Sequence, residues 1–435
     1  MRGRCSVGIE RSTCWLGVVN SDRIRTLDAV RGMAVMGIVL MNIVALGMPS
    51  YAYFDPTFYG THGSADWAAW TINYVLSEGK FRALFTMLFG ASMVVIAERA
   101  EANADGPGPA MTHYRRMFWL FVIGMIHAWC LWYGDILVQY AVGGLLGFLI
   151  WQWRPRALWF FFAAMLSLQT ATSLARYADL APARAVALAA GATPQAIAAR
   201  QQHMAHDQPI AKEAADELKG YRGDVKSVFE TRAKTTNFFQ TFLIPITMPE
   251  IFAFMALGIL LLRNGFLTGA WSRRSYWVAI FSGYLIAVPL TAALGNVLRS
   301  VNFDPAIQAL CDSGSLLLRP FIAIAHAAVV ITLIRSNITP RIMNRIEAIG
   351  RMALSNYLGT TLIATTFFYG YGFGWFGYLG RAQLYVVVVA IWTVMLLWSK
   401  PWLAHFRYGP AEWAWRSLAR WERQPLVRER NRYCE

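Results

Sequence analysis

Long apolar runs, separated by short polar and basic segments, are the dominant pattern of this chain. Each run has roughly the 20 residues that a helix needs to cross a hydrocarbon core of about 30 Å. The runs are continuous, whereas strands of a membrane β-barrel would show about ten residues of alternating polarity. The pattern therefore predicts an all-α, polytopic integral membrane protein with about ten transmembrane helices. Their expected positions are residues 29–48, 81–97, 116–133, 136–152, 157–173, 240–262, 275–295, 319–334, 352–371 and 383–399.

Composition supports this prediction. Hydrophobic residues make up 56% of the 435 residues and charged residues only 15%, against about 25% charged in soluble domains. In a soluble chain the net charge of +15 would suggest a nucleic-acid partner. In a membrane protein Lys and Arg gather instead in cytoplasmic loops, so we expect membrane lipid as a partner and no nucleic acid.

The basic residues also predict an orientation. Pairs such as Arg154/Arg156 and Arg273/Arg274 alternate with segment 49–66, which has neither Lys nor Arg. We expect a multi-pass protein of the bacterial inner (plasma) membrane with both termini in the cytoplasm. The predicted parts are a cytoplasmic N-terminal segment (1–26), helices 1–5 (27–175), an Ala-rich extracytoplasmic helical insertion (176–237), helices 6–10 (238–400) and a basic cytoplasmic C-terminal segment (401–435). The insertion is either a cap over a site or a passive spacer.

Charged residues interrupt the second apolar segment. Glu78, Lys80 and Arg82 lie between two apolar stretches. If residues 66–95 form one helix it is about 45 Å long and these charges face a polar cavity or the interface, because ionisable groups inside a membrane mark functional paths. Alternatively, residues 66–79 form a short interfacial helix and the charges lie at the membrane surface.

The first apolar helix begins with "LDAVRG", which places Asp28 and Arg31 on one helical face. This pair either anchors the helix or takes part in a site. Arg31 and Asn42 are 11 residues apart, within about 20° of alignment and separated by about 16 Å along the helix. Arg116 and His127 repeat the spacing, as a polar path across a membrane would require.

His127, in "GMIHAWCLWYGDILVQYA", is the main candidate for proton transfer, because imidazole titrates near neutral pH. Asp135 either orients His127 or caps the next helix, and His127 itself could instead only bond a neighbouring helix. His62, His326 and the pair His203/His206 are weaker candidates. No metal site is expected, because the cysteines show no ligand spacing. The sequence has no phosphate-loop motif and no GxGxxG that follows a predicted strand, which argues against ATP-driven pumping.

Five segments, "LDAVRGMAVMGIVLMNI", "KFRALFTMLFG", "GMIHAWCLWYGDILVQYA", "GRMALSNY" and "FRYGPAEWAWR", resemble the YeiB-like family of bacterial membrane proteins, a domain of unknown function, over residues 27 to 416. The "LDxxRG" segment is also similar to transmembrane acyltransferases that acetylate heparan-type glucosamine or O-acylate bacterial glycans. This resemblance implies an acyl donor used from the cytoplasm, an acceptor on the far side and an essential histidine. Glycan O-acyltransferases carry a histidine near the end of helix 1, where this chain has Asn42.

We therefore expect an acyltransferase that moves an acyl group from a co-substrate such as acetyl-CoA to an extracytoplasmic hydroxyl or amine of a small molecule or glycan. The candidate catalytic residues are His127, Asp135 and Asn42, and the candidate residues for binding the acyl donor are Asp28, Arg31, Arg116, Lys80 and Arg82. Cations there would neutralise the phosphates of the acyl donor. Two alternatives stay open: a transporter or flippase for a small metabolite or lipid-linked intermediate, and a purely structural or partner-binding protein.

Overall fold

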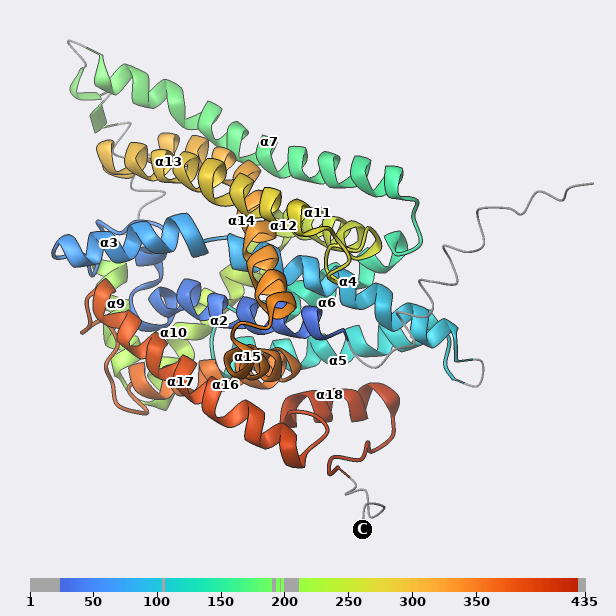
Figure 1. The fold of residues 1–435 in the computed structure, drawn as a ribbon. Coiled ribbons are helices and arrows are strands. Elements are labelled where there is room, and N and C mark those ends of the chain that lie inside the picture. The colour runs from blue at the N-terminus through green and yellow to red at the C-terminus, as the bar shows by residue number, and fades with distance from the viewer. Residues whose placement is uncertain (1–23, 104–105, 190–192, 196, 199–210, 429–435) are drawn as a thin grey trace, which may run out of the picture.

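The computed structural model describes residues 24–103, 106–189, 193–195, 197–198 and 211–428. Helices account for nearly all of this part of the chain (Figure 1), and its one β-bridge joins Phe406 to Val427. The predicted all-α fold is confirmed.

The helices are α2 (Arg25–Gly47), α3 (Ser64–Ile72), α4 (Lys80–Glu101), α5 (Pro109–Cys130), α6 (Leu137–Gly147), α7 (Pro155–Leu188), α9 (Ala211–Arg222), α10 (Val225–Phe238), α11 (Ile244–Arg263), α12 (Arg273–Phe281), α13 (Val288–Ser300), α14 (Pro305–Ser336), α15 (Pro340–Arg351), α16 (Ala353–Phe368), α17 (Arg381–His405) and α18 (Pro410–Arg420). Short 3-10 turns, η1 (Ser50–Tyr53) and η3 (Phe148–Ile150), follow α2 and α6. Single π-helical turns, η2 (Asn73–Ser77), η4 (Phe239–Leu243) and η5 (Ser282–Ala287), follow α3, α10 and α12.

Seven helical segments in the described part of the chain are long and apolar enough to cross a membrane. They are α2, α7, α14 and α17, together with the joined segments Ser64–Glu101, Val225–Arg263 and Arg273–Ser300. The other three predicted windows fall on α5, α6 with η3, and α16. Every apolar run in the sequence therefore lies on a helix, and the protein is a polytopic membrane protein.

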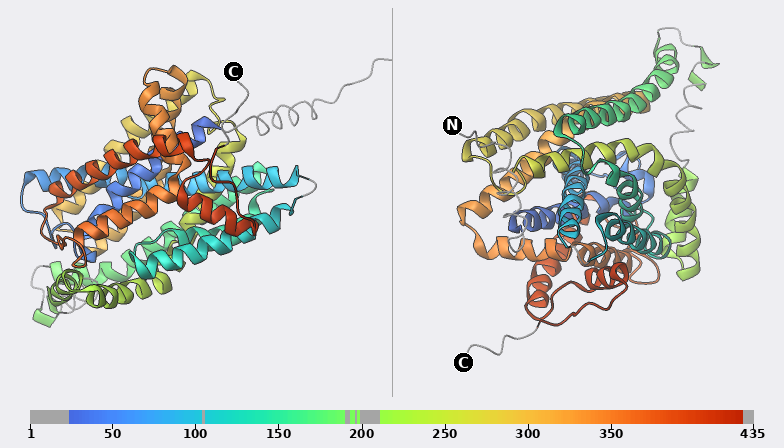
Figure 2. Two further views of the ribbon diagram at one scale, coloured as in Figure 1. Left: turned by 90° about the horizontal axis from the view of Figure 1, so that it is seen from below. Right: turned by 90° about the vertical axis from the view of Figure 1, so that its right-hand side faces the viewer.

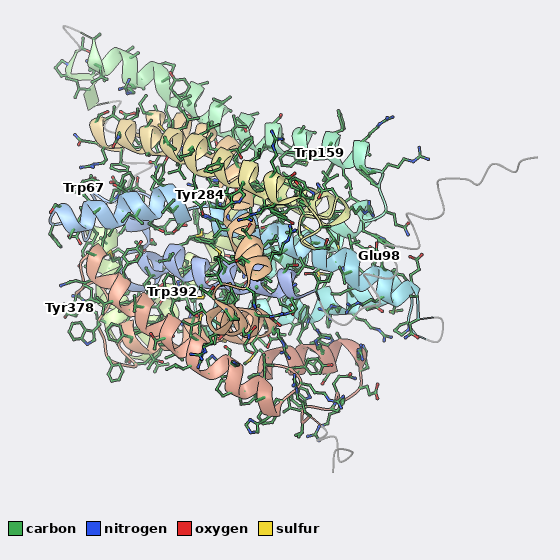
Figure 3. The ribbon with its side chains drawn as sticks, viewed as in Figure 1. Trp67, Glu98, Trp159, Tyr284, Tyr378 and Trp392 are labelled. Atoms are coloured by element: carbon green, nitrogen blue, oxygen red, sulfur yellow. The ribbon has the colours of Figure 1, made fainter. Side chains whose placement is uncertain are left out.

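Most of the long helices run side by side, so the molecule has two ends. At the end that we call the insertion end, α9 packs on the segments that follow α2 and α16: Glu217 accepts a hydrogen bond from the Ser50 backbone N–H at 2.6 Å, and Arg222 donates to the Phe376 carbonyl at 2.7 Å. Trp67 and Tyr378 lie at this end and Glu98 at the opposite one (Figure 3). We call the opposite end, which carries Arg25 at the start of α2, the basic end.

Helix α7 lies along one edge of the molecule (Figure 1; Figure 2, right). Its apolar side chains Trp159, Phe160 and Leu168 are 49%, 77% and 48% exposed, as expected for a face toward lipid. Residues 176–188, the first part of the predicted insertion, continue α7, and residues 225–238 form α10, which leads through η4 into α11.

Helix α2 is the central helix and packs against α4, α14, α15, α16 and α17. Glycines let its backbone touch α15: a Cβ atom at Gly32 would lie 2.0 Å from the Ile346 carbonyl oxygen, and one at Gly350 would lie 1.7 Å from that of Asp28. Membrane helices use small residues in this way, because close packing replaces the hydrophobic effect inside lipid.

The second apolar segment is interrupted at the charges that the sequence shows there. Helix α3 ends in the π-helical turn η2, and Gly79 then adopts a left-handed conformation, with φ of 73°, before α4 begins. Glycine permits this backbone without steric cost. Neither expectation for this segment holds in full: the helix is not continuous, yet Glu78 and Arg82 face a cavity inside the molecule.

Candidate functional site

A cavity of about 320 Å³ lies in the half of the molecule nearer the insertion end. Segments on either side of the α3–α4 interruption line it, as do α2, α11, α14 and the loop before α6. Aromatic rings form much of the wall, and polar groups from several helices converge on it, as in most binding sites for small molecules. The polar side chains used below are Asn42, Glu78, Arg82, Asp135, Glu250 and Arg319.

His127 and Asp135 form the hydrogen bond that the sequence suggested. His127 lies in the last turn of α5, and its Nδ1 is 2.8 Å from Oδ1 of Asp135 in the loop before α6. The other carboxylate oxygen of Asp135 accepts a 2.7 Å hydrogen bond from the Val138 backbone N–H. Asp135 thus plays both of the structural parts considered for it: it holds His127 and caps the start of α6.

The second nitrogen of His127 faces a hydroxyl group from a distant part of the chain. Nε2 lies 3.0 Å from Oγ1 of Thr361, in the middle of α16. An ionised carboxylate can only accept hydrogen bonds, so the Nδ1–H group of His127 donates the hydrogen bond to Asp135. In a neutral imidazole Nε2 then accepts the proton of the Thr361 hydroxyl. His127 and Thr361 are only 1% and 2% exposed, so this chain of bonds is shielded from competing solvent.

Asn42 lies between this group and the cavity. It lines the cavity and also a second, small gap, whose other lining residues include Val35, Trp132 and Thr361. The structure therefore brings the three predicted catalytic residues, His127, Asp135 and Asn42, into one region. Asn42 is the predicted residue that faces both spaces.

A charge network lies on another wall of the cavity. Glu250 of α11 is 4% exposed, and its carboxylate accepts hydrogen bonds from Arg82 at 3.2 Å and from Arg319 of α14 at 2.9 Å. Two arginines on one carboxylate satisfy a charge that would otherwise be costly to bury. Lys80, two residues before Arg82 in α4, is fully buried and donates to the Tyr74 carbonyl at 2.6 Å.

The remaining predicted donor-binding residues lie toward the basic end. Arg31 forms a 2.8 Å ion pair with Asp28 and a 2.8 Å hydrogen bond with Ser92 of α4. Ser92 is ten residues beyond Arg82, about 15 Å along the helix. Arg116 of α5 stacks over the Trp415 ring of α18 at 4.1 Å. The five residues proposed for binding the acyl donor therefore occupy two separate places, with Lys80 and Arg82 in the cavity half.

Helix α9 closes the insertion end beside the cavity. Its Glu217 accepts hydrogen bonds from both the backbone N–H and the hydroxyl of Ser50, each at 2.6 Å, and Ser50 also lines the cavity. Burial raises the pKa of the Glu217 carboxyl above its usual range. The contact joins the second part of the predicted insertion to a residue of the cavity wall.

The weaker histidine candidates are accounted for differently. His326 of α14 accepts a hydrogen bond from Tyr284 at 2.6 Å and bonds the Leu76 carbonyl at 2.9 Å. His62 lies in the loop before α3, and His203 and His206 lie outside the described residues. Within the described ranges no group of three or more His, Cys, Asp or Glu side chains is arranged to hold a metal ion.

Comparisons with known proteins complete this description. The family model "Protein of unknown function (DUF418)" matches residues 261–422. "Uncharacterized protein YeiB" of Escherichia coli (strain K12) is 29% identical over 410 residues, which cover 94% of this chain and 99% of that protein. The predicted resemblance to the YeiB-like family is confirmed. "Uncharacterized protein YxaH" of Bacillus subtilis (strain 168) is 26% identical over 429 residues, covering 94% of this chain and 98% of that relative.

The YeiB-like likeness extends over nearly the whole chain, whereas the DUF418 model covers its later part. The matched residues 261–422 begin near the end of α11 and include Thr361 of α16. His127 and Asp135 precede them. The site described above therefore combines a segment inside the DUF418 match with a segment before it, and the names of the YeiB-like relatives state no activity.

Proposed function

We propose that the protein is a membrane acyltransferase, which moves an acyl group from a cytoplasmic co-substrate such as acetyl-CoA to an extracytoplasmic hydroxyl or amine. The observation that carries this proposal is the Asp135–His127 hydrogen bond of 2.8 Å beside a polar cavity. A neutral imidazole held by a carboxylate can take a proton from a hydroxyl or amine, because the carboxylate stabilises the imidazolium that forms.

The cavity would hold the acceptor. Its wall combines aromatic rings with the Asn42 amide and the charged groups of Arg82 and Glu250, which suits a polar small molecule or a glycan unit. The cavity lies in the half of the molecule nearer the insertion end. In this proposal that end faces outside the cell, which the distribution of Lys and Arg in the sequence supports.

The basic end would then face the cytoplasm and the acyl donor. Arg31 and Arg116 lie there and offer guanidinium groups to the phosphates of a CoA thioester. Arg31 already has Asp28 and Ser92 as partners, which hold its side chain in place. In this proposal Arg82, which lines the cavity, belongs to the acceptor site, and Lys80 is buried near it at the start of α4.

The test is to incubate the purified protein in lipid nanodiscs with radiolabelled acetyl-CoA and to follow label leaving the thioester. His127→Ala should abolish this consumption while the protein stays folded and membrane-inserted. His405→Ala is the matched control, because that exposed side chain bonds the Pro401 carbonyl of its own helix at the far end of α17. Equal consumption by wild type and His127→Ala would contradict the proposal.

A transporter or flippase is the second candidate, and one observation favours it. Transporters often place binding sites at interrupted helices, and the interruption at Gly79 lies directly beside Glu78 in the cavity wall. Solute flux into proteoliposomes without a covalent product, together with no consumption of acyl donor, would support transport over acyl transfer.

A further inference from the structure

We propose that Thr361 is a nucleophile, which carries the acyl group as a covalent ester between the acyl donor and the acceptor. This inference rests on the proposed acyltransferase function and adds a two-step reaction to it. Sequence reasoning gave no role to Thr361, because the residue lies 234 positions from His127 along the chain.

The geometry is that of an activated hydroxyl. Oγ1 of Thr361 lies 3.0 Å from Nε2 of His127, whose Nδ1 lies 2.8 Å from Asp135. A hydroxyl, an imidazole and a carboxylate in series at these distances form the arrangement by which enzymes activate weak nucleophiles. The hydroxyl also lies 3.4 Å from the Tyr357 carbonyl of its own helix, a weaker contact than the one to His127.

The neighbouring residue shows that this arrangement is specific to one position. Thr360 precedes Thr361 and lines the same small gap. Its hydroxyl donates to the Asn356 carbonyl one turn back in α16, at 2.8 Å. That contact is the ordinary bond of a threonine inside a helix. A threonine in this helix therefore does not acquire a histidine partner by depth alone. Thr366 of α16 provides the matched control, because its hydroxyl donates to the Leu362 carbonyl at 2.7 Å and its side chain does not line the gap.

The gap beside Thr361 holds about 10 Å³, roughly the room for one water molecule, so an acyl group there requires the surrounding side chains to move apart. Val35, Val39 and Trp132 give it an apolar wall, and the Asn42 side chain faces it from α2. The apolar wall suits the alkyl part of a short acyl group. An amide N–H of Asn42 would stabilise the oxyanion that forms when the carbonyl carbon becomes tetrahedral.

The proposed reaction has two steps, and the bonds and protons balance in each. In the first, Oγ1 of Thr361 attacks the thioester carbonyl, His127 takes the hydroxyl proton, and the C–S bond breaks to give the Thr361 ester while the proton passes to the departing thiolate. In the second, an acceptor hydroxyl or amine attacks the ester, His127 takes its proton, and the C–O bond to Thr361 breaks with that proton returning to Oγ1. The enzyme ends unchanged, and the products are a free thiol and an acylated acceptor.

The position of Thr361 along α16 suggests why a covalent ester intermediate would be useful. The residue is eight positions after Ala353 in a helix of 16 residues, about 12 Å from its start. It therefore lies midway along α16. An acyl group waiting on Thr361 could be delivered from one end and collected from the other, without both substrates being present together.

The test uses p-nitrophenyl acetate, an acetyl ester that needs no CoA site, with the full-length protein in nanodiscs. We expect rapid release of p-nitrophenolate and an acetyl group on the peptide that contains residue 361, detected by mass spectrometry after acid quench. Thr361→Val should reduce that adduct at least tenfold, Thr361→Ser should keep it at residue 361, and Thr366→Val should leave it unchanged. Gel filtration checks the folding of each variant.

The outcomes separate this inference from the function on which it rests. An unlabelled wild-type protein, or equal labelling of wild type and Thr361→Val, overturns the nucleophile. If Thr361→Val also consumes acetyl-CoA at the wild-type rate while His127→Ala does not, the acyltransferase stands and acyl transfer is direct. If His127→Ala consumes acetyl-CoA like wild type, the proposed function itself fails.

Discussion

Two buried histidines, His127 and His326, have nearly the same exposed fraction and the same number of hydrogen-bonded ring nitrogens. They are 1% and 4% exposed, both lie in helices of the membrane bundle, and both have each ring nitrogen within hydrogen-bond distance of a partner. Each also faces one hydroxyl group, from Thr361 or Tyr284. They differ in the partner on the opposite nitrogen, which is the Asp135 carboxylate for His127 and the Leu76 carbonyl for His326.

That difference separates a reactive group from a structural one. A backbone carbonyl fixes the tautomer of His326 and joins α14 to η2, but it stabilises an imidazolium far less than a charged carboxylate does. His326 also stacks on Phe81 with ring centroids 4.9 Å apart. Burial and hydrogen-bond count therefore do not identify a catalytic histidine, whereas the charge of its partner and the space beside that partner do.

Replacing each histidine in a separate variant is the most direct test of this difference, and we expect the largest effect from it. His127→Ala should lower acyl transfer by about 10⁴-fold, the upper range for losing a general base. His326→Ala should lower thermal stability and leave the rate per folded molecule within about threefold. The measurement is release of free CoA, normalised to the monodisperse fraction on gel filtration. Equal loss of rate in both variants would mean that both histidines only support the fold.

Asp135→Asn should convert the partner of His127 into one as neutral as that of His326. We expect acyl transfer to fall by about 10³-fold, since an amide does not stabilise the imidazolium. The amide oxygen can still accept from the Val138 N–H, so the start of α6 should be preserved. Circular dichroism and rate would be measured together, and an unchanged rate would show that the carboxylate serves only as a cap.

Asn42→Ala tests the small gap beside Thr361, the hydroxyl partner of His127. Removing one amide that stabilises an oxyanion should lower the rate by about 10²-fold. The Michaelis constant for the acyl donor should change little, because the amide acts on the transition state. A higher Michaelis constant with an unchanged turnover number would instead assign Asn42 to substrate binding.

Tyr284→Phe should have the smallest effect, and it tests whether His326 has only a structural role. It removes the hydroxyl that bonds His326, which should cost about 1 kcal/mol of stability and leave acyl transfer unchanged. A thermal unfolding curve in detergent measures the first quantity and CoA release the second. A rate loss in this variant would link His326 to the reaction.

The sequence predicted those features that depend on neighbouring residues. The apolar runs located the helices because membrane crossing imposes a minimum length. Asp28–Arg31 was predictable because a three-residue spacing places both on one helical face. His127–Asp135 was predictable because Asp135 lies in the short loop that follows the last turn of α5, where His127 lies, so the chain itself keeps them near.

Contacts between distant helices left no comparable signal. Thr361 lies in a helix with several threonines, and nothing in "GTTLIATTFF" distinguishes the one that meets His127. Arg82 was one of three charges in an apolar segment, which indicates that it has a partner but not that this partner is Glu250, 168 residues away. The sequence also did not give the depth of each residue in the bundle. Spacing along the chain did not show that Arg31 lies toward the basic end and Arg82 in the half nearer the insertion end.

The contact between α2 and α15 has a consequence for genetics. At Gly32 and Gly350 the two backbones leave no room for even a methyl group, since an added Cβ would lie within 2.0 Å of a carbonyl oxygen. A random mutagenesis screen for lost activity should therefore recover these glycines as readily as His127. Such alleles would reduce the amount of assembled protein in the membrane, and immunoblotting would distinguish them from alleles that spare abundance and remove chemistry.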